Sequence, residues 1–235
     1  MSLPQEPYRT RAEQQRQMRG TQSMSAWYAH PRTIVLMLTR PLAIKVGNTD
    51  TSTHDYDECG WCYFERRISS LVKQGSCLWD IANFDESCSG SSFRDLCQRL
   101  KAKRPLPLSP ERAEEELRRS VADGSLTFMA SADFDAVADL DVIVGLYAAG
   151  FVSAINDHAY NSCSAKGGEG DIYLTGLEWG DAKAAKLAEA LKYAAVHCAP
   201  ANKRSFFLAA NKFTYAGKRV IEEAVEGSEW LEVVW

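Results

Sequence analysis

The chain has 235 residues, of which 46% are hydrophobic and 25% are charged, and its formal net charge is −4. This composition is typical of a globular protein that buries a substantial core without covalent staples. The weakly acidic balance gives no overall sign of nucleic-acid binding, so no nucleic-acid partner is expected.

Cysteine usage and the N-terminal sequence indicate a cytoplasmic, reducing location. The first residues lack the apolar core of a secretory signal peptide, and the seven cysteines are odd in number and irregularly spaced. We therefore expect reduced thiols in an intracellular protein. The longest nearly apolar stretch, Val142–Ile155, is short for a membrane crossing, so it predicts a buried helix and no membrane span.

The first predicted elements are a helix and a strand. Thr10 and Glu13 have the spacing of a capping box, which predicts a helix over Arg11–Trp27. The β-branched and apolar run Thr33–Thr39 predicts a central strand covered on both faces.

A second amphipathic helix is expected over Gly60–Gln74, followed by a short strand at Cys77–Ile81. Glu65 falls at the edge of the apolar stripe of this helix, one turn from Trp61 and from Ile68. Partial desolvation there would raise the pKa of the carboxyl group, and such groups concentrate at functional sites. The alternative is a glutamate at the helix border that pairs with an arginine or reaches solvent.

Prolines mark a linker after residue 104, at positions 105, 107 and 110. Ser109 followed by Pro110 predicts the N-cap and first residue of a charged helix that ends near Val121. A further helix is expected over Ala132–Phe151.

The C-terminal third contains an internal repeat. Leu174–Leu191 aligns with Leu208–Val225, 34 positions later, and each unit predicts a short strand, a turn and a helix. Asn211 is placed to hydrogen-bond the turn backbone. The pattern resembles the long, ribonuclease-inhibitor type of leucine-rich repeat, with an insertion at Cys198–Arg204 and a third strand at Trp230–Val234. So few units must be supported by the rest of the chain.

The segment Tyr56–Glu65 carries the most specific motif. A Trp-Cys pair at the helix start, with a glutamate three residues after the cysteine, resembles the WCxxE signature of TIR and TIR-like domains. With Ser2–Gln5, Arg9-Thr10 and Trp27–His30, the chain is similar to a protist group of TIR-like proteins over about residues 2–75.

This resemblance implies candidate site residues. In enzymatic relatives the signature glutamate cleaves NAD, so Glu65 would be the catalytic residue and NAD a possible substrate, with no certain cofactor. Trp61, Cys62 and His30 would be the NAD-binding residues, with Trp61 as a wall of the pocket and Cys62 packed behind the helix. His30 would be a catalytic partner or, alternatively, a helix-terminal histidine favoured by the helix dipole.

Two features depart from the family pattern. Cys59 stands where the protist group typically has arginine. The chain also begins in the middle of the expected domain, without the first strand, the first helix and most of the second strand. These segments build much of the nucleotide pocket in enzymatic relatives, so a fragment, a truncated gene model or a degenerate copy is expected.

Cys59 and Cys62 also form a C-x-x-C motif at a helix start, which in a thiol oxidoreductase would be a dithiol of low pKa. A zinc site would need two more ligands at suitable spacing, so no metal is expected.

Together these patterns predict an α/β fold with an incomplete TIR-like parallel sheet at 1–104, a helical linker at 105–168 and leucine-rich-repeat-like β/α units at 169–235. The expected function is that of a signalling or scaffold protein with protein partners or self-association. The first alternative is an NAD glycohydrolase using Glu65, and the second is a thiol redox protein using Cys59 and Cys62.

Overall fold

The computed structural model describes residues 10–30, 33–40, 45–46, 49–50, 56–73, 75–128, 136–156 and 170–235. Its helices are α1 (Arg11–Ala29), α2 (Gly60–Ser69), α3 (Phe93–Arg99), α4 (Pro110–Ala122), α5 (Ala136–Asn156), α6 (Asp181–His197) and α7 (Tyr215–Val225). Its strands are β1 (Val35–Met37), β2 (Lys45–Val46), β3 (Thr49–Asp50), β4 (Leu78–Asp80), β5 (Ile172–Tyr173), β6 (Arg204–Phe207) and β7 (Leu231–Val234). The predicted motif Ser2–Gln5 and Cys163 lie outside these residues.

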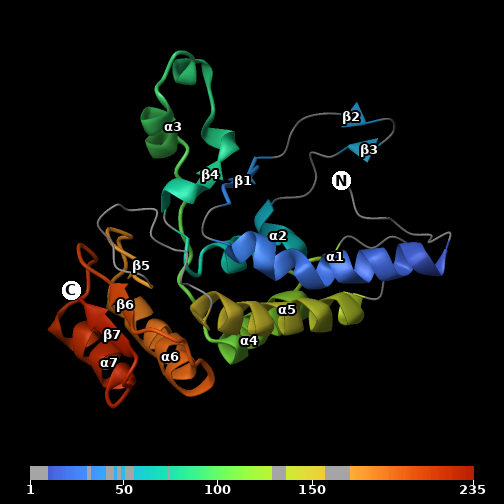
Figure 1. Ribbon diagram of the computed structural model, residues 1–235. Coiled ribbons are helices and arrows are strands. Elements are labelled where there is room, and N and C mark those ends of the chain that lie inside the picture. Colours follow the sequence, from blue (N-terminus) through green and yellow to red (C-terminus); the bar gives the residue numbers. More distant parts are fainter. Residues whose placement is uncertain are drawn as a thin grey trace.

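The protein is a mixed α/β structure with short parallel sheets, as the sequence predicts (Figure 1). β1 pairs in parallel with β4, β2 pairs antiparallel with β3, and β5, β6 and β7 form a parallel sheet in that order. Because α2 lies between β1 and β4 in the chain, these three elements form one β-α-β unit.

The predicted helix starts are confirmed at two caps. The Thr10 hydroxyl accepts a hydrogen bond from the Glu13 backbone N–H at 3.2 Å. At the start of α4, the Ser109 hydroxyl accepts from the Arg112 N–H at 3.2 Å, and Pro110 is the first helical residue. Each cap satisfies a backbone donor that has no partner within the helix.

The prediction that the Thr33–Thr39 strand is covered on both faces is wrong. Val35 and Met37 are buried, whereas Leu36 between them is 58% exposed. In the described part of the chain β1 has only β4 beside it, and one face of this pair packs under Tyr28 of α1 and Tyr56. The other face of this two-stranded pair, which carries Leu36, is therefore not covered by the described part of the chain.

The main core surrounds α5, which lies beside α1, α2 and α4 (Figure 1). Ile143 and Tyr147 of α5 are fully buried. A Cβ atom on Gly150 would lie 2.6 Å from the Ile68 Cδ1 of α2 and 2.7 Å from the Ser25 Cβ of α1. Glycine at this position therefore lets three helices approach one another closely.

By length and composition alone, the Asp139–Asn156 segment of α5 would be able to cross a membrane, and it is the one such helix in the described part of the chain. In this structure its buried side chains belong to the main core. The Tyr147 hydroxyl donates a hydrogen bond to the Leu108 carbonyl at 2.9 Å. This bond ties α5 to the segment Leu100–Ser109 between α3 and α4, which is called the linker from here on.

The C-terminal units are held in register by one asparagine. Ile172 pairs with Phe206, 34 residues later, as the repeat predicts. The Asn211 amide nitrogen donates to the carbonyls of Leu174 and Leu208 at 2.7 and 2.8 Å, while its oxygen accepts from the backbone N–H groups of Leu177 and Trp179. The predicted hydrogen bonding of Asn211 to the turn backbone is therefore confirmed.

Three buried cations close the C-terminal ends of three helices. Lys73, Arg104 and Arg204 are each less than 5% exposed. Lys73 donates to the carbonyl of His30, the C-cap of α1. Arg204 donates to the Ile155 and Asn156 carbonyls at the end of α5, at 3.1 and 2.8 Å. The last carbonyls of a helix lack helical partners and carry partial negative charge, which makes a cation a suitable cap.

Arg104 also joins distant parts of the chain. Its Nε and Nη2 donate to the Ser70 and Leu71 carbonyls after α2, at 2.7 and 3.1 Å, and its Nη1 donates to the Tyr173 carbonyl of β5 at 2.8 Å. Burial lowers the pKa of the guanidinium to about 9, so the group remains charged at neutral pH. This one side chain therefore connects α2, the linker and the C-terminal sheet.

We predict that Arg104→Met lowers the free energy of unfolding by roughly 3 kcal/mol or more, because three carbonyls lose their donor and two of the hydrogen bonds are buried. Urea denaturation followed by circular dichroism measures the change. Arg94→Met, in the exposed part of α3, is the matched control and should change stability little. Equal midpoints for the two variants would contradict this role of Arg104.

Candidate functional site

The helix α2, which carries the Trp-Cys motif, begins at a crowded point. Cys59 is its N-cap, and the Gly60 N–H donates to the Thr127 carbonyl at 3.0 Å. A Cβ atom on Gly60 would lie 2.3 Å from a ring carbon of Phe128, so a larger residue would displace this contact. The fixed start of α2 directs Glu65 toward α1 and Arg67 toward the linker and α4.

Glu65 lies half-buried against α1. Burial raises the pKa of its carboxyl group, a hydrogen bond from the Tyr28 hydroxyl opposes the shift, and the nearby Cys59 adds to it. The raised pKa expected from its place at the stripe edge is confirmed. Among the described residues, Glu65 is hydrogen-bonded to Tyr28 and not paired with an arginine, which was one form of the alternative interpretation.

Two phenols and two thiols surround this carboxylate. Burial raises the pKa of Tyr28 and of Tyr56, and the charge of Glu65 adds to both shifts. Neither tyrosine was identified as a site residue from the sequence, although both lie within the motifs that carry the family resemblance. The contact of Tyr28 with α2 depends on how α1 packs, which no local pattern reveals, whereas Tyr56 lies in the turn directly before α2.

The thiol of Cys62 lacks the electrostatics of a reactive nucleophile. The side chains of Cys59 and Cys62 are hydrogen-bonded, and this bond, with burial and the neighbouring charges of Cys59 and Glu65, raises the pKa of the Cys62 thiol. A nucleophilic cysteine requires the opposite shift, because the thiolate is the reactive form. No disulfide joins Cys59 to Cys62.

Trp61 lies in a contact between helices, and His30 lies at the end of α1. The Trp61 indole N–H donates to the Asp139 carboxylate of α5 at 3.2 Å, and its ring meets Phe64 edge to face at 6.2 Å. His30 is the exposed C-cap of α1, with its backbone N–H donating to the Trp27 carbonyl. Trp61 therefore fastens α2 to α5, and His30 stands where its alternative interpretation placed it.

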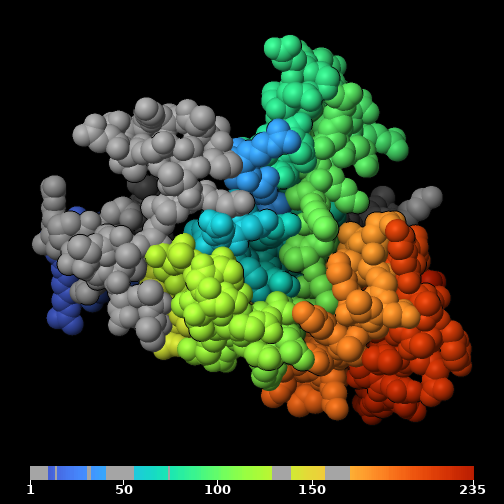
Figure 2. Space-filling view, turned by 180° about the vertical axis from the view of Figure 1, so that it is seen from behind, coloured from blue at the N-terminus to red at the C-terminus, as the bar shows by residue number. Residues whose placement is uncertain are grey.

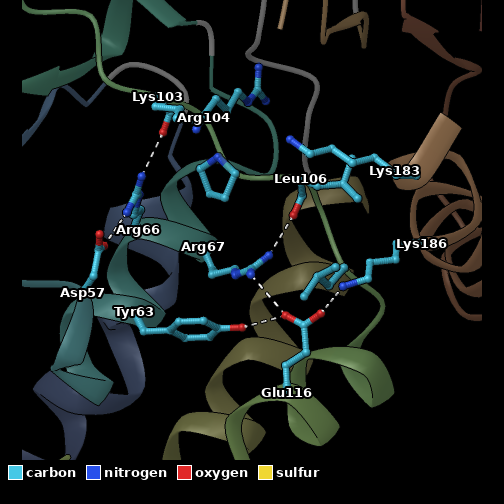
Figure 3. A pocket seen from close by; sticks show the side chains of 13 residues that line it. Asp57, Tyr63, Arg66, Arg67, Lys103, Arg104, Leu106, Glu116, Lys183 and Lys186 are labelled. Carbon is cyan, nitrogen blue, oxygen red and sulfur yellow. Dashed lines mark hydrogen bonds and ion pairs between the residues drawn. The ribbon is translucent and has the colours of Figure 1, made fainter. Parts of the chain in front are cut away.

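A cavity of about 470 Å³ lies along the side of α2 that carries Tyr63, Arg66 and Arg67. The linker, α4 and α6 supply its other walls (Figure 3). Figure 2 shows cyan α2, the green linker, yellow-green α4 and orange α6 together on one face. Glu65 is not among the described residues that line this cavity.

Glu116 of α4 organises one wall of the cavity. One of its carboxylate oxygens accepts from Arg67 at 3.2 Å and from the Tyr63 hydroxyl at 3.4 Å, and the other accepts from Lys186 of α6 at 2.7 Å (Figure 3). The Glu116 side chain is only 12% exposed, so these contacts keep a mostly buried charge compensated. Arg67 also donates to the Leu106 carbonyl at 3.0 Å.

Comparisons of this chain with family models, with curated proteins and with solved structures found no match.

We predict that Glu65→Gln makes the protein more stable than wild type at pH 7. The raised folded-state pKa means that ionised Glu65 costs stability above its unfolded pKa, and glutamine keeps an acceptor for Tyr28 without the charge. The stability gained by Glu65→Gln should shrink as the pH falls. It should vanish below about pH 4, where Glu65 is protonated in both the folded and the unfolded state. Urea midpoints between pH 4 and 8 measure this, with exposed Glu229→Gln as control. A less stable Glu65→Gln protein at pH 7 would contradict the prediction.

Proposed function

We propose that this protein is an intracellular interaction module that works by binding a protein partner. Its first part is TIR-like and its C-terminal part is a short leucine-rich-repeat tail. The parallel β1–α2–β4 order, with Trp61 and Glu65 on α2, supports the first assignment. The 34-residue register and the four hydrogen bonds of Asn211 support the second.

The observation that carries this proposal is an apolar row across the outer face of the β5–β6–β7 sheet. Tyr173, Phe207 and Val234 occupy the same register position on the three strands. The Tyr173 and Phe207 rings are stacked, with centroids 4.8 Å apart and planes 13° apart. None of the three is fully buried, whereas Ile172 and Phe206 point into the core.

A polar row borders the apolar row. The Ser205 hydroxyl donates to Glu232 at 2.6 Å, and Lys203 forms an ion pair with the same carboxylate. Aromatic side chains with a polar border are the usual composition of a protein-binding surface. Parallel strands of stacked repeats present such rows as one continuous surface.

The described cysteines agree with a reducing, intracellular location, which is part of the proposal. No disulfide joins the six described cysteines, at positions 59, 62, 77, 88, 97 and 198. Protein partners or a second copy of the chain would both fit a module of this kind.

NAD hydrolysis by Glu65 is the second candidate function, and one observation favours it. The raised pKa of the Glu65 carboxyl group is the kind of perturbation that catalytic carboxylates show. However, its carboxylate is hydrogen-bonded to Tyr28, and the large cavity lies along another side of α2. A protein-binding function therefore explains more of these structural features than NAD hydrolysis does.

We predict that Phe207→Asp lowers partner recovery at least tenfold in affinity capture from an extract of the cells that make the protein. A charge at the centre of the apolar row would have to be desolvated on binding. Val220→Asp, on the exposed side of α7, is the matched control and should recover partners like wild type. Recovery of the same proteins at equal yield by both variants would contradict the role of the sheet face.

A further inference from the structure

The cavity beside α2 has a charge that differs from that of the whole protein. Six cationic side chains line it: Arg66, Arg67, Lys103, Arg104, Lys183 and Lys186. Only two carboxylates, Asp57 and Glu116, are among the described lining residues, which leaves an excess of four positive charges. The chain as a whole carries −4, so this concentration of cations is local.

Most of these cations are already compensated. Glu116 pairs with Arg67 and Lys186, and Asp57 pairs with Arg66. Arg104 is directed to backbone carbonyls. The two carboxylates therefore pair with three of the six cations.

Lys103 and Lys183 remain without a carboxylate among the described residues. Lys103 is exposed at the edge of the cavity. The Lys183 ammonium lies 5.9 Å from the centre of the Trp179 ring and points from α6 toward the cavity (Figure 3). The cavity therefore presents two positive groups, from the linker and from α6, that an incoming anion meets.

The electrostatics of Lys183 show that these charges repel one another. Burial lowers its pKa, and the positive charges of Lys103 and Arg67 lower it further. In addition, the Nε of Arg66 is buried and has no acceptor in the described part of the chain. An anion in the cavity would relieve the repulsion and supply acceptor oxygens.

We propose that this cavity binds a small anion with two or three linked phosphate groups, and that Lys103, Lys183 and Arg66 contact its oxygens. A terminal phosphate group carries roughly −1.5 to −2 charges at neutral pH and each further linked group adds negative charge, so two or three linked groups approach the cationic excess. A volume of about 470 Å³ is within the usual range for small-ligand sites. Leu106, Leu108 and Pro105 add an apolar wall, which suits a ligand with an organic part.

Inorganic triphosphate added to the 235-residue chain tests this proposal. We expect it to raise the melting temperature, because a ligand that binds only the folded state stabilises it. Isothermal titration calorimetry at constant ionic strength measures the affinity. We expect Lys183→Gln and Lys103→Gln each to weaken binding, and the double variant to weaken it at least tenfold.

The control variant is Lys192→Gln, which removes the same charge from an exposed position of α6 outside the cavity. It should bind triphosphate like wild type. The proposal is overturned if wild type does not bind, if Lys192→Gln weakens binding as much as Lys183→Gln, or if sulfate at equal ionic strength stabilises the protein equally. Circular dichroism establishes that each variant is folded.

Discussion

Buried positive charge at helix ends is the constraint on which the arrangement of this protein depends. Lys73, Arg104 and Arg204 sit where α1, α2 and α5 end, and each donates to carbonyls that the helix leaves without partners. A buried cation is costly unless acceptors surround it. Each helix end and its cation therefore stabilise each other. Arg104 also donates to the carbonyl of Tyr173 in β5, 69 residues after Arg104 in the chain, and so links the end of α2 to the C-terminal sheet.

The anchoring of α2 at both ends determines which of its side chains face α1 and which face the cavity. With its start fixed at Gly60 and its end closed by Arg104, α2 places Glu65 against Tyr28 and presents Arg66 and Arg67 to the cavity. The carboxylate that the family resemblance marks as catalytic is thus part of a helix–helix contact. The charged surface that the resemblance does not mark is the one that borders an open volume.

Local sequence patterns predicted many of the helices and strands but did not predict the cavity or its cationic wall. Capping residues such as Ser109, and the repeat around Asn211, act within a few residues or at a fixed period, so the sequence displays them. The cationic wall combines Arg67, Lys103 and Lys183, which only tertiary packing brings together. The coverage of β1 was predicted wrongly because a continuous apolar run does not reveal how many strands a sheet has or what packs on its faces.

Whether Glu65 is a structural or a catalytic carboxylate is the most direct question that these features raise. The measurement is nicotinamide release from NAD by the purified, reduced 235-residue chain, beside Glu65→Ala and with circular dichroism to establish folding. Because the carboxylate is hydrogen-bonded to Tyr28 and lies outside the described lining of the cavity, we expect no turnover from either protein. Turnover by wild type that Glu65→Ala abolishes would contradict a binding function and identify an NAD hydrolase.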